Sequence, residues 1–334
     1  MKRIQLKNTY EDIICLENLL DAWKEFTVGK RLRKDVQVFE LNLMANIISL
    51  HRDLVTRQYI HSPYAAFNIS DPKPRNIHKA AVRDRLLHHA IYRVLYSFFN
   101  SKFIPDSYSC RIGKGTHKAM DRFQKYGYKV SKNHARTVWV LKCDIRKFFA
   151  SIDHSILLAI LDRSIPDKDI IWLLSRVIGS FRSTGEGVGL PLGNLTSQLL
   201  VNIYMNEFDQ FAKHSLKAKW YVRYADDFVI LSENRDWLQE ILERIGQFLR
   251  DRLKLELHPT KVSIETFASG VDFLGWVHFP DHRVMRTATK WRMMRRAQEQ
   301  PNDESIQSYI GLLSHGNAVK ATNEFLAVSG VQGE

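Results

Sequence analysis

Residues 220–231, WYVRYADDFVIL, place two adjacent aspartates between two apolar, strand-like segments at 220–224 and 228–231. This pattern predicts a β-hairpin with Asp226 and Asp227 at its tip. Neighbouring carboxylates repel each other and aspartate is depleted in strands, so the pair needs a compensating partner. A divalent cation would supply that compensation, and an ordinary solvated turn is the alternative.

A second apolar segment supplies a third carboxylate. The string TVWVLKCDI, from residue 137, is short and rich in β-branched residues, which favours a strand buried on both faces, and it reaches Asp144 at its end. If this strand lies beside the hairpin, Asp144, Asp226 and Asp227 meet at one end of a sheet. Three carboxylates there can hold two Mg²⁺ ions, one activating a 3′-hydroxyl and one binding triphosphate oxygens. The pattern therefore indicates phosphoryl transfer.

The chain carries a strong positive charge. Its 334 residues contain 49 Lys plus Arg against 36 Asp plus Glu, a net charge of +13. A polyanion such as nucleic acid is the expected partner, and an unspecialised basic surface is the alternative. With 45% hydrophobic residues the chain can bury a large core, which excludes a disordered tail protein.

The cysteines and the chain start indicate the compartment. Cys15, Cys110 and Cys143 are far apart and form no CxxC pair, so the sequence predicts neither a disulfide framework nor a zinc knuckle. The first residues, MKRIQLKN, lack the apolar h-region of a signal peptide. Apolar runs stay well below the ~20 residues of a membrane span. We therefore expect a soluble cytoplasmic protein in a reducing compartment, with no membrane partner.

Around these strands the sequence pattern is mostly helical. Apolar stripes predict helices at 10–26 and 43–54, separated by the basic segment GKRLRK at 29–34, which either touches phosphate or is simply solvated. The prolines of PKPR, residues 72–75, predict extended chain before a helix at 82–98. The remaining predicted elements are helices near 156–161, 170–178, 197–211 and 238–249, strands near 262–266 and 271–279, and a helical segment at the C-terminal end that begins with basic residues.

Seven sequence blocks, in their order along the chain, resemble the blocks of reverse transcriptases. They are KPRNIHKAAVRDRLLHHAI from Lys73, SYSCRIGKGTHKAM from Ser107, LKCDIRKFFASIDH from Leu141, GLPLGNLTSQLLVNIYMNEFDQF from Gly189, YVRYADDFVIL from Tyr221, LKLELHPTKV from Leu253 and GVDFLGWVHF from Gly270. The resemblance spans nearly the whole chain. It implies an RNA-directed DNA polymerase, a nucleotidyltransferase that uses two Mg²⁺ ions.

The resemblance also implies an α+β, right-hand polymerase fold in which helices pack behind an antiparallel palm sheet. The expected parts are an N-terminal helical extension at 1–60, fingers at 61–135 interleaved with the palm, a palm at 136–280 and a short helical thumb at 281–334. The C-terminal string SYIGLLSHGNA, residues 308–318, is similar to the thumb shared with group II intron enzymes.

Positions that match the blocks imply roles for individual residues. Lys73 and Arg75 match basic fingers residues that contact the incoming triphosphate, and Arg111 joins them from the second block. For these cations a generic basic surface is the alternative. The residues that match the catalytic, metal-binding carboxylates are Asp144, Asp226 and Asp227.

An aromatic residue is expected beneath the sugar of the incoming nucleotide. Phe149 matches this gate, where a bulky ring would exclude a 2′-hydroxyl, and the adjacent Phe148 is the rival candidate. Lys261 matches a lysine near the nucleotide or the primer. The residues that match the primer grip are Phe273, Leu274 and Gly275.

The fourth block departs from most reverse transcriptases, which carry glutamine in LPQG. Here Leu192 takes that place, and the string LGNLTSQ at 192–198 is similar to the form found in diversity-generating retroelements. Those enzymes copy a template-repeat RNA with frequent errors opposite adenine, and the cDNA replaces a variable repeat in a target gene by mutagenic retrohoming. An aliphatic side chain cannot hydrogen-bond the nucleotide or template, so the resemblance implies low fidelity, with Leu192 and Arg75 as the fidelity residues.

This branch implies a set of partners. They are the template-repeat RNA, dNTPs, the cDNA with its RNA/DNA duplex, and a small, basic helical-bundle accessory protein, the variability determinant, assembled as a ring. Two alternatives stay open: an antiphage, abortive-infection or group II intron-type reverse transcriptase, and a non-catalytic RNA-binding scaffold with the same fold.

Overall fold

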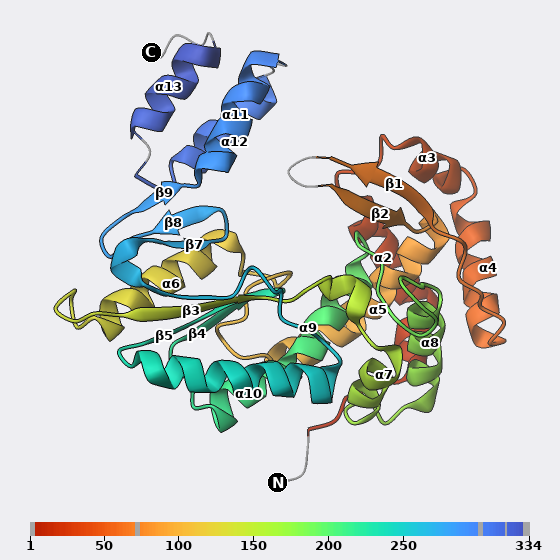
Figure 1. Ribbon diagram of the computed structural model, residues 1–334. Helices are drawn as coiled ribbons and strands as arrows, with labels where there is room; N and C mark the ends of the chain where they lie inside the picture. Colours follow the sequence, from red (N-terminus) through yellow and green to blue (C-terminus); the bar gives the residue numbers. More distant parts are fainter. Residues whose placement is uncertain (1–3, 71–73, 300–302, 318, 330–334) are drawn as a thin grey trace. The chain divides into compact units, whose positions relative to one another are not determined.

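A computed structural model describes residues 4–70, 74–299, 303–317 and 319–329 (Figure 1). The chain forms two compact units, each built from separated stretches of sequence. The first unit comprises Met1–Pro105, Ile145–Phe211 and Gln247–Glu256, and the second comprises Asp106–Asp144, Ala212–Gly246 and Leu257–Glu334. The expected boundaries of extension, fingers, palm and thumb remain a prediction.

The first unit is mainly helical. Its elements are α1 (Tyr10–Ile14), α2 (Leu16–Thr27), α3 (Lys34–Glu40), α4 (Leu43–Val55), the antiparallel hairpin β1 (Ala65–Ile69) and β2 (Arg75–Lys79), α5 (Val82–Lys102), the 3₁₀ helix η1 (Phe148–Ser151), α7 (His154–Asp162), α8 (Lys168–Gly179) and α9 (Leu195–Gln210). A π-helical turn at Phe211–Ser215 follows α9, and only its first residue belongs to this unit. Helix α5 lies at the centre of the unit and packs against both α2 and α9.

The helix predicted at 10–26 is interrupted at Cys15, which has an extended ψ of 149°. Side chains take over carbonyls that a continuous helix would use. Asn18 Nδ2 donates to the Ile13 carbonyl at 2.8 Å, and His51 Nδ1 donates to the Ile14 carbonyl at 2.9 Å. The segment expected as a basic loop also ends earlier than predicted, because Lys34 already begins α3. Both differences come from tertiary contacts and local capping that periodicity does not register.

The second unit is organised around a four-stranded antiparallel sheet with the order β4–β5–β3–β6. Its strands are β3 (Trp139–Asp144), β4 (Tyr221–Tyr224), β5 (Asp227–Ser232) and β6 (Ser263–Thr266). The prediction that 137–145 forms a strand buried on both faces is confirmed, because Val140 and Leu141, which point to opposite faces, are both fully buried.

Helix α6 (Thr116–Val130) packs on this sheet, and Figure 1 shows it in yellow beside β3 and β4. Its Phe123 is fully buried in a core that also contains Val140, Val222 and Val229. Burying one such aromatic side chain contributes about 1.5–3 kcal/mol. Helix α10 (Arg235–Leu253) follows β5, and its Leu238 and other apolar side chains are buried.

A smaller three-stranded sheet and three helices complete the second unit. The strands are β7 (Val271–Phe273), β8 (Trp276–His278) and β9 (Arg283–Met285), and the helices are α11 (Thr287–Glu299), α12 (Asp303–Leu313) and α13 (Val319–Ser329). Their core joins Trp276 to Met293, Met294 and Phe325. The mixed fold of helices and antiparallel sheets predicted from the sequence is confirmed. Among the described residues, none of the helices combines the length and the apolar character that crossing a membrane requires.

Candidate active site

The predicted carboxylates meet at one end of the four-stranded sheet. Asp144, the last residue of β3, pairs directly with Asp227, the first residue of β5. Asp227 also pairs with Tyr224 of β4, so a two-residue turn of Ala225 and Asp226 closes the hairpin. Ala225 has φ +55°, the left-handed conformation that such tight hairpin turns require. The antiparallel register therefore brings residues that are remote in sequence to one edge of the sheet.

A buried arginine supports this turn. Arg223 is fully buried, and its guanidinium donates to the Ala225 carbonyl at 3.0 Å and to Ser107 Oγ at 3.1 Å. Backbone hydrogen bonds of 2.9 Å link Arg223 to Asp106 and Tyr108. A buried charge is costly unless it is hydrogen-bonded, so Arg223 fixes the turn geometry as well as filling space. Sequence reasoning missed this residue, although a lone arginine inside an apolar strand was a usable signal.

The three carboxylates of the site repel one another. Burial, followed by repulsion from Asp226 and Asp144, raises the pKa of Asp227 to about 7, while Lys142 and Lys261 act in the opposite direction. A carboxylate in this position is stabilised by a nearby cation. The site therefore has an excess of negative charge that a bound cation would relieve.

Lys261 supplies part of that positive charge. Its Nζ lies 3.0 and 3.1 Å from the two carboxylate oxygens of Asp144. The segment that carries Lys261 is tied to β3, because the His258 backbone N–H donates to the Asp144 carbonyl at 2.8 Å. The structure thus places Lys261 beside Asp144, and the position near the nucleotide or the primer that the resemblance implied stays a prediction.

The carboxylates fit a hard divalent cation by their chemistry, since Mg²⁺ prefers oxygen ligands and carboxylates in particular. Among the described residues, however, no three or more His, Cys, Asp or Glu side chains lie close enough together to hold a metal ion. Lys261 instead holds Asp144. That Asp144, Asp226 and Asp227 bind two Mg²⁺ ions therefore stays a prediction.

Three further predicted residues, together with the rival gate Phe148, are described in the first unit. Arg75 begins β2 and is exposed, and Leu192 is half-buried, with its carbonyl accepting from the His78 backbone N–H at 3.2 Å. In η1 the two candidate gates differ: Phe148 is buried, with 3% of its surface exposed, whereas Phe149 is only partly buried. Lys73 lies outside the described residues.

The remaining predicted residues belong to the second unit. The Arg111 guanidinium donates to the Ser107 carbonyl at 2.8 Å, within the segment that also contacts Arg223. Phe273 ends β7, and Leu274 and Gly275, at φ +55° and φ +87°, form the turn to β8. Phe273 is fully buried, so its packing in the core holds the start of the turn in place.

An acidic hairpin beside a third acidic strand end, on an antiparallel sheet covered by helices, is the palm arrangement of a nucleic-acid polymerase. Comparison with known proteins defines the class further. Residues 70–278 match the family described as "Reverse transcriptase (RNA-dependent DNA polymerase)", and the chain belongs to that family. The enzyme class expected from the sequence, RNA-directed DNA polymerase, is confirmed.

Relatives support the same assignment. Protein YkfC of Escherichia coli K12 is 26% identical, over 92% of this chain and 86% of its own length. The group II intron-encoded protein LtrA of Lactococcus lactis is 24% identical over 62% of this chain, which spans only 44% of LtrA. Group II intron-type proteins are thus among the homologues.

A solved structure supports the fold. Apo telomerase from Candida tropicalis, truncated from its C-terminal domain, superposes with a TM-score of 0.52 at 13% identity, covering 73% of this chain and 60% of that one. The right-hand polymerase fold predicted from the sequence is confirmed by this similarity together with the family match.

Proposed function

We propose that this enzyme copies a template-repeat RNA into error-prone cDNA that diversifies a target gene by mutagenic retrohoming. Polymerisation is supported by the direct pairing of Asp144 with Asp227 next to Asp226. The mutagenic specialisation is supported by the string at 192–198, which replaces a glutamine with Leu192.

Asp144, Asp226 and Asp227 would hold two Mg²⁺ ions, which when bound supply charge stabilisation for attack of a primer 3′-hydroxyl on the nucleotide triphosphate. Two other residues of the chain support this arrangement. Lys261 balances the carboxylates, and Arg223 keeps the hairpin turn in place.

Other residues would position the substrates. Lys73, Arg75 and Arg111 would contact the triphosphate of an incoming dNTP, because guanidinium and ammonium groups are the natural donors to phosphate oxygens. Phe149 would lie beneath the sugar, and its partial exposure favours it over the buried Phe148. Phe273, Leu274 and Gly275 would grip the primer end. RNA template and the RNA/DNA duplex are the expected polyanionic partners of a chain with net charge +13.

A small, basic helical-bundle accessory protein is proposed as a further partner. Exposed apolar side chains on α3, on α4 and in the turn between them offer it a surface: Val38, Leu41, Met44 and Ile48 expose 60%, 82%, 51% and 50% of their area. Met44 and Ile48 are four residues apart and lie on one stripe of α4, whereas Leu41 precedes that helix. Charging the stripe with Met44→Glu and Ile48→Glu should abolish co-purification of the accessory protein and leave the fold intact.

The decisive experiment tests polymerisation first. The double variant Asp226→Ala, Asp227→Ala should lose cDNA synthesis on the template-repeat RNA encoded beside the gene, while it should still bind that RNA. If a biological phenotype of the protein survived this change, the non-catalytic scaffold would be favoured instead.

The second candidate function is a group II intron-type or antiphage reverse transcriptase, and the similarity to LtrA favours the intron type. Sequencing of the cDNA and of the adjacent genome separates the two. Adjacent near-repeats that differ mainly where one copy has adenine support a diversity-generating retroelement. A surrounding intron or a phage-defence locus supports the second candidate function.

A further inference from the structure

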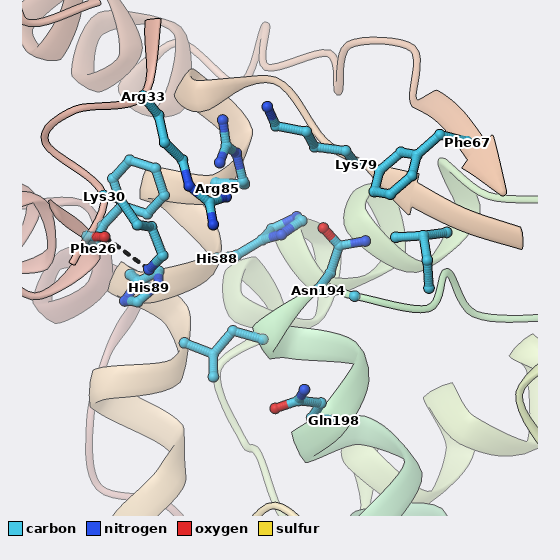
Figure 2. Close-up of a pocket in the computed structure, with 13 residues that line it drawn as sticks. Phe26, Lys30, Arg33, Phe67, Lys79, Arg85, His88, His89, Asn194 and Gln198 are labelled. Atoms are coloured by element: carbon cyan, nitrogen blue, oxygen red, sulfur yellow. Dashed lines mark hydrogen bonds between the residues drawn. The ribbon is translucent and has the colours of Figure 1, made fainter. Parts of the chain in front are cut away.

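The β1–β2 hairpin, which carries Arg75, has little packing of its own. Among its described residues, none in either strand is buried. A cavity of about 410 Å³ lies between the hairpin, α2, α5 and the start of α9, with Phe67 and Lys79 of the hairpin in its wall (Figure 2). A two-stranded hairpin is only marginally stable by itself. The orientation of this hairpin is therefore set by the contacts at its base.

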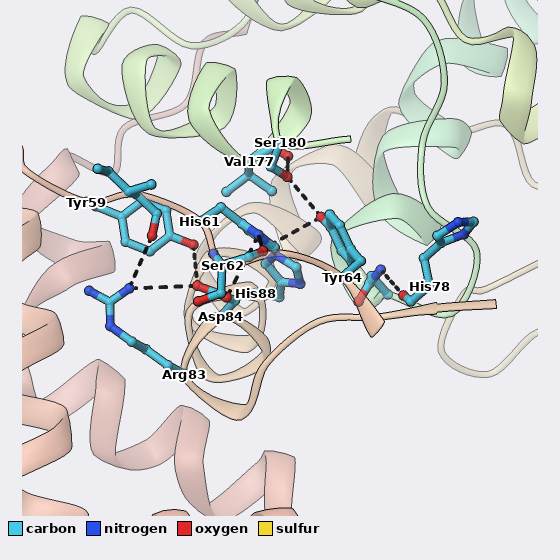
Figure 3. Close-up of polar contacts among 12 residues, drawn as sticks. Tyr59, His61, Ser62, Tyr64, His78, Arg83, Asp84, His88, Val177 and Ser180 are labelled. Carbon is cyan, nitrogen blue, oxygen red and sulfur yellow. Dashed lines mark hydrogen bonds and ion pairs between the residues drawn. The ribbon is translucent and has the colours of Figure 1, made fainter. Parts of the chain in front are cut away.

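The segment that leads into β1 is held on a buried carboxylate of α5. Asp84, in the first turn of that helix, is fully buried. Its two oxygens accept from the Tyr59 hydroxyl at 2.8 Å and from the Ser62 backbone N–H at 3.0 Å (Figure 3). The Arg83 guanidinium and His61 Nδ1 each lie 3.8 Å from the carboxylate and help to balance its charge. Asp84 thus fixes the start of the segment on α5.

Tyr64 ties the end of the same segment to α8. Its hydroxyl lies 2.9 Å from the hydroxyl of Ser180, the residue that follows α8, and 3.2 Å from His61 Nε2. Ser180 donates its one hydroxyl proton to the Val177 carbonyl at 2.6 Å, so Tyr64 is the donor in the bond to Ser180. Because Tyr64 directly precedes Ala65, the first residue of β1, this bond fixes the point at which the hairpin begins.

The Tyr64 ring also contacts the other strand of the hairpin. It lies edge-to-face against the His78 ring of β2, with the ring centroids 6.5 Å apart (Figure 3). Phe181 packs against both rings, at 5.7 Å from Tyr64 and 4.7 Å from His78. Burial lowers the pKa of His78, which favours the neutral ring in this aromatic cluster. Tyr64 therefore holds β1 through the chain and β2 through a side-chain contact.

The position of Arg75 depends on this base. Next to Tyr64, Ala65 pairs with Lys79, and at the other end of the hairpin Ile69 pairs with Arg75. Four residue steps along a strand span about 13 Å, so a rotation of about 5° at the base moves the Arg75 end by about 1 Å. A misplacement of that size is enough to weaken a well-placed contact with a substrate.

We propose that Tyr64 is a positioning residue for the incoming nucleotide: its bond to Ser180 holds the β1–β2 hairpin in the orientation from which Arg75 reaches the triphosphate. Asp84 supports the same segment from α5. Both residues act through the hairpin and neither touches the nucleotide. The inference rests on the proposed contact between Arg75 and the triphosphate.

The first experiment removes the bond from each end. Tyr64→Phe keeps the ring and deletes the hydroxyl, and Ser180→Ala deletes its partner. The full chain incorporates dTTP on a poly(rA) template primed with oligo(dT), and kcat and KM are measured. Both variants should raise KM for dTTP about three- to tenfold, the usual effect of losing one hydrogen bond, with kcat within about twofold of wild type. Wild-type KM values in both variants overturn the proposal.

Tyr10→Phe is the matched control. Tyr10 is a buried tyrosine of the same unit, and its hydroxyl donates to the Leu54 carbonyl at 2.9 Å, which links α1 to α4. This variant should lower the urea unfolding midpoint about as much as Tyr64→Phe but leave KM for dTTP at the wild-type value. Equal rises of KM in Tyr10→Phe and Tyr64→Phe would come from lost stability in general and would overturn the proposal.

The second experiment tests the route through Arg75. In an Arg75→Ala background, Tyr64→Phe should raise KM for dTTP little further, because the residue that it positions is gone. If the two changes multiply, Tyr64 acts by another route and the proposal is overturned, while the triphosphate contact stands. If Arg75→Ala alone leaves KM unchanged, the triphosphate contact is wrong and the proposal falls with it.

Binding of the primed template is measured separately, by fluorescence anisotropy without dTTP. Its affinity should stay at the wild-type value in Tyr64→Phe and Ser180→Ala, because the hairpin is proposed to act on the nucleotide. A loss of template affinity as large as the rise in KM would place the effect in nucleic-acid binding and would overturn the proposal.

Discussion

Lys261 Nζ contacts both carboxylate oxygens of Asp144, at 3.0 and 3.1 Å, so the carboxylate that ends β3 is already paired with a cation. A lysine in that position competes with a metal ion for the same oxygens. The Lys261 charge also opposes the burial and the repulsion from Asp226 and Asp144 that together raise the pKa of Asp227 to about 7.

Replacing this lysine should make the protein depend more on divalent cations. We expect Lys261→Met to lose about 0.5–1 kcal/mol of unfolding free energy in EDTA, a small value because 44% of the Lys261 side chain is exposed. Mg²⁺ should restore more stability to the variant than to wild type, because Lys261 no longer competes with the ion for the Asp144 oxygens. Urea unfolding with EDTA and with Mg²⁺ measures both effects. The exposed Lys129→Met on α6 is the control, and equal Mg²⁺ stabilisation of wild type and Lys261→Met would contradict the prediction.

Asp153 should make stability depend on pH in the acid range. Burial alone would raise its pKa, but hydrogen bonds from Lys254, Ser155 and the Ile156 backbone lower the pKa of Asp153 from 3.8 to about 2. Lys254 Nζ lies 2.6 Å away, and the carboxylate caps α7, directly after η1 with Phe149. The stabilisation is therefore complete above the unfolded pKa of 3.8 and is lost as the pH falls from there towards 2.

Asp153→Asn keeps a good capping side chain but removes the charge. It should cost about 1 kcal/mol at pH 7, a modest value because 61% of the Lys254 side chain is exposed. The difference from wild type should shrink steadily below pH 4. Urea midpoints between pH 7 and pH 3 provide the measurement, and Asp162→Asn, an exposed aspartate at the other end of α7, is the control. A cost that stays constant over this range would show that the charge is not responsible.

The site was predictable from sequence to the extent that it depends on strands. Alternating and continuous apolar runs placed Asp144 and Asp227 at strand ends, and antiparallel pairing then brings them together. The lone Arg223 inside an apolar strand was a signal in the sequence, but its role was not, because its partners, the Ala225 carbonyl and Ser107 Oγ, meet it only in the folded sheet. The break at Cys15 escaped for the same reason, since Asn18 and His51 compete for helix carbonyls.

Leu192 should limit fidelity. Its side chain is half-buried, and the backbone at this position is held by the 3.2 Å hydrogen bond from the His78 N–H to its carbonyl, so a substitution changes the side chain without displacing the segment. Leu192→Gln restores a group that can hydrogen-bond the nucleotide or template, and errors opposite template adenine should fall several-fold. Steady-state incorporation opposite adenine, with template uracil as the internal control, measures the change. Unchanged error rates would remove Leu192 from the explanation.

The two adjacent phenylalanines of η1 should separate selectivity from stability. Phe148 is 3% exposed, whereas Phe149 is partly buried and its carbonyl accepts from the Leu190 N–H at 2.8 Å. Phe148→Ala should therefore cost about 3–5 kcal/mol of unfolding free energy, the usual result of removing a core aromatic ring. Phe149→Ala should cost much less, because solvent already reaches the ring, and it should instead relax discrimination against ribonucleotides by tenfold or more. Relative kcat/KM for dNTP and rNTP, measured beside urea unfolding of both variants, tests the pair. If Phe149→Ala kept full sugar selectivity while remaining folded, Phe149 would not be the gate, and the ring that excludes the 2′-hydroxyl would have to be sought elsewhere.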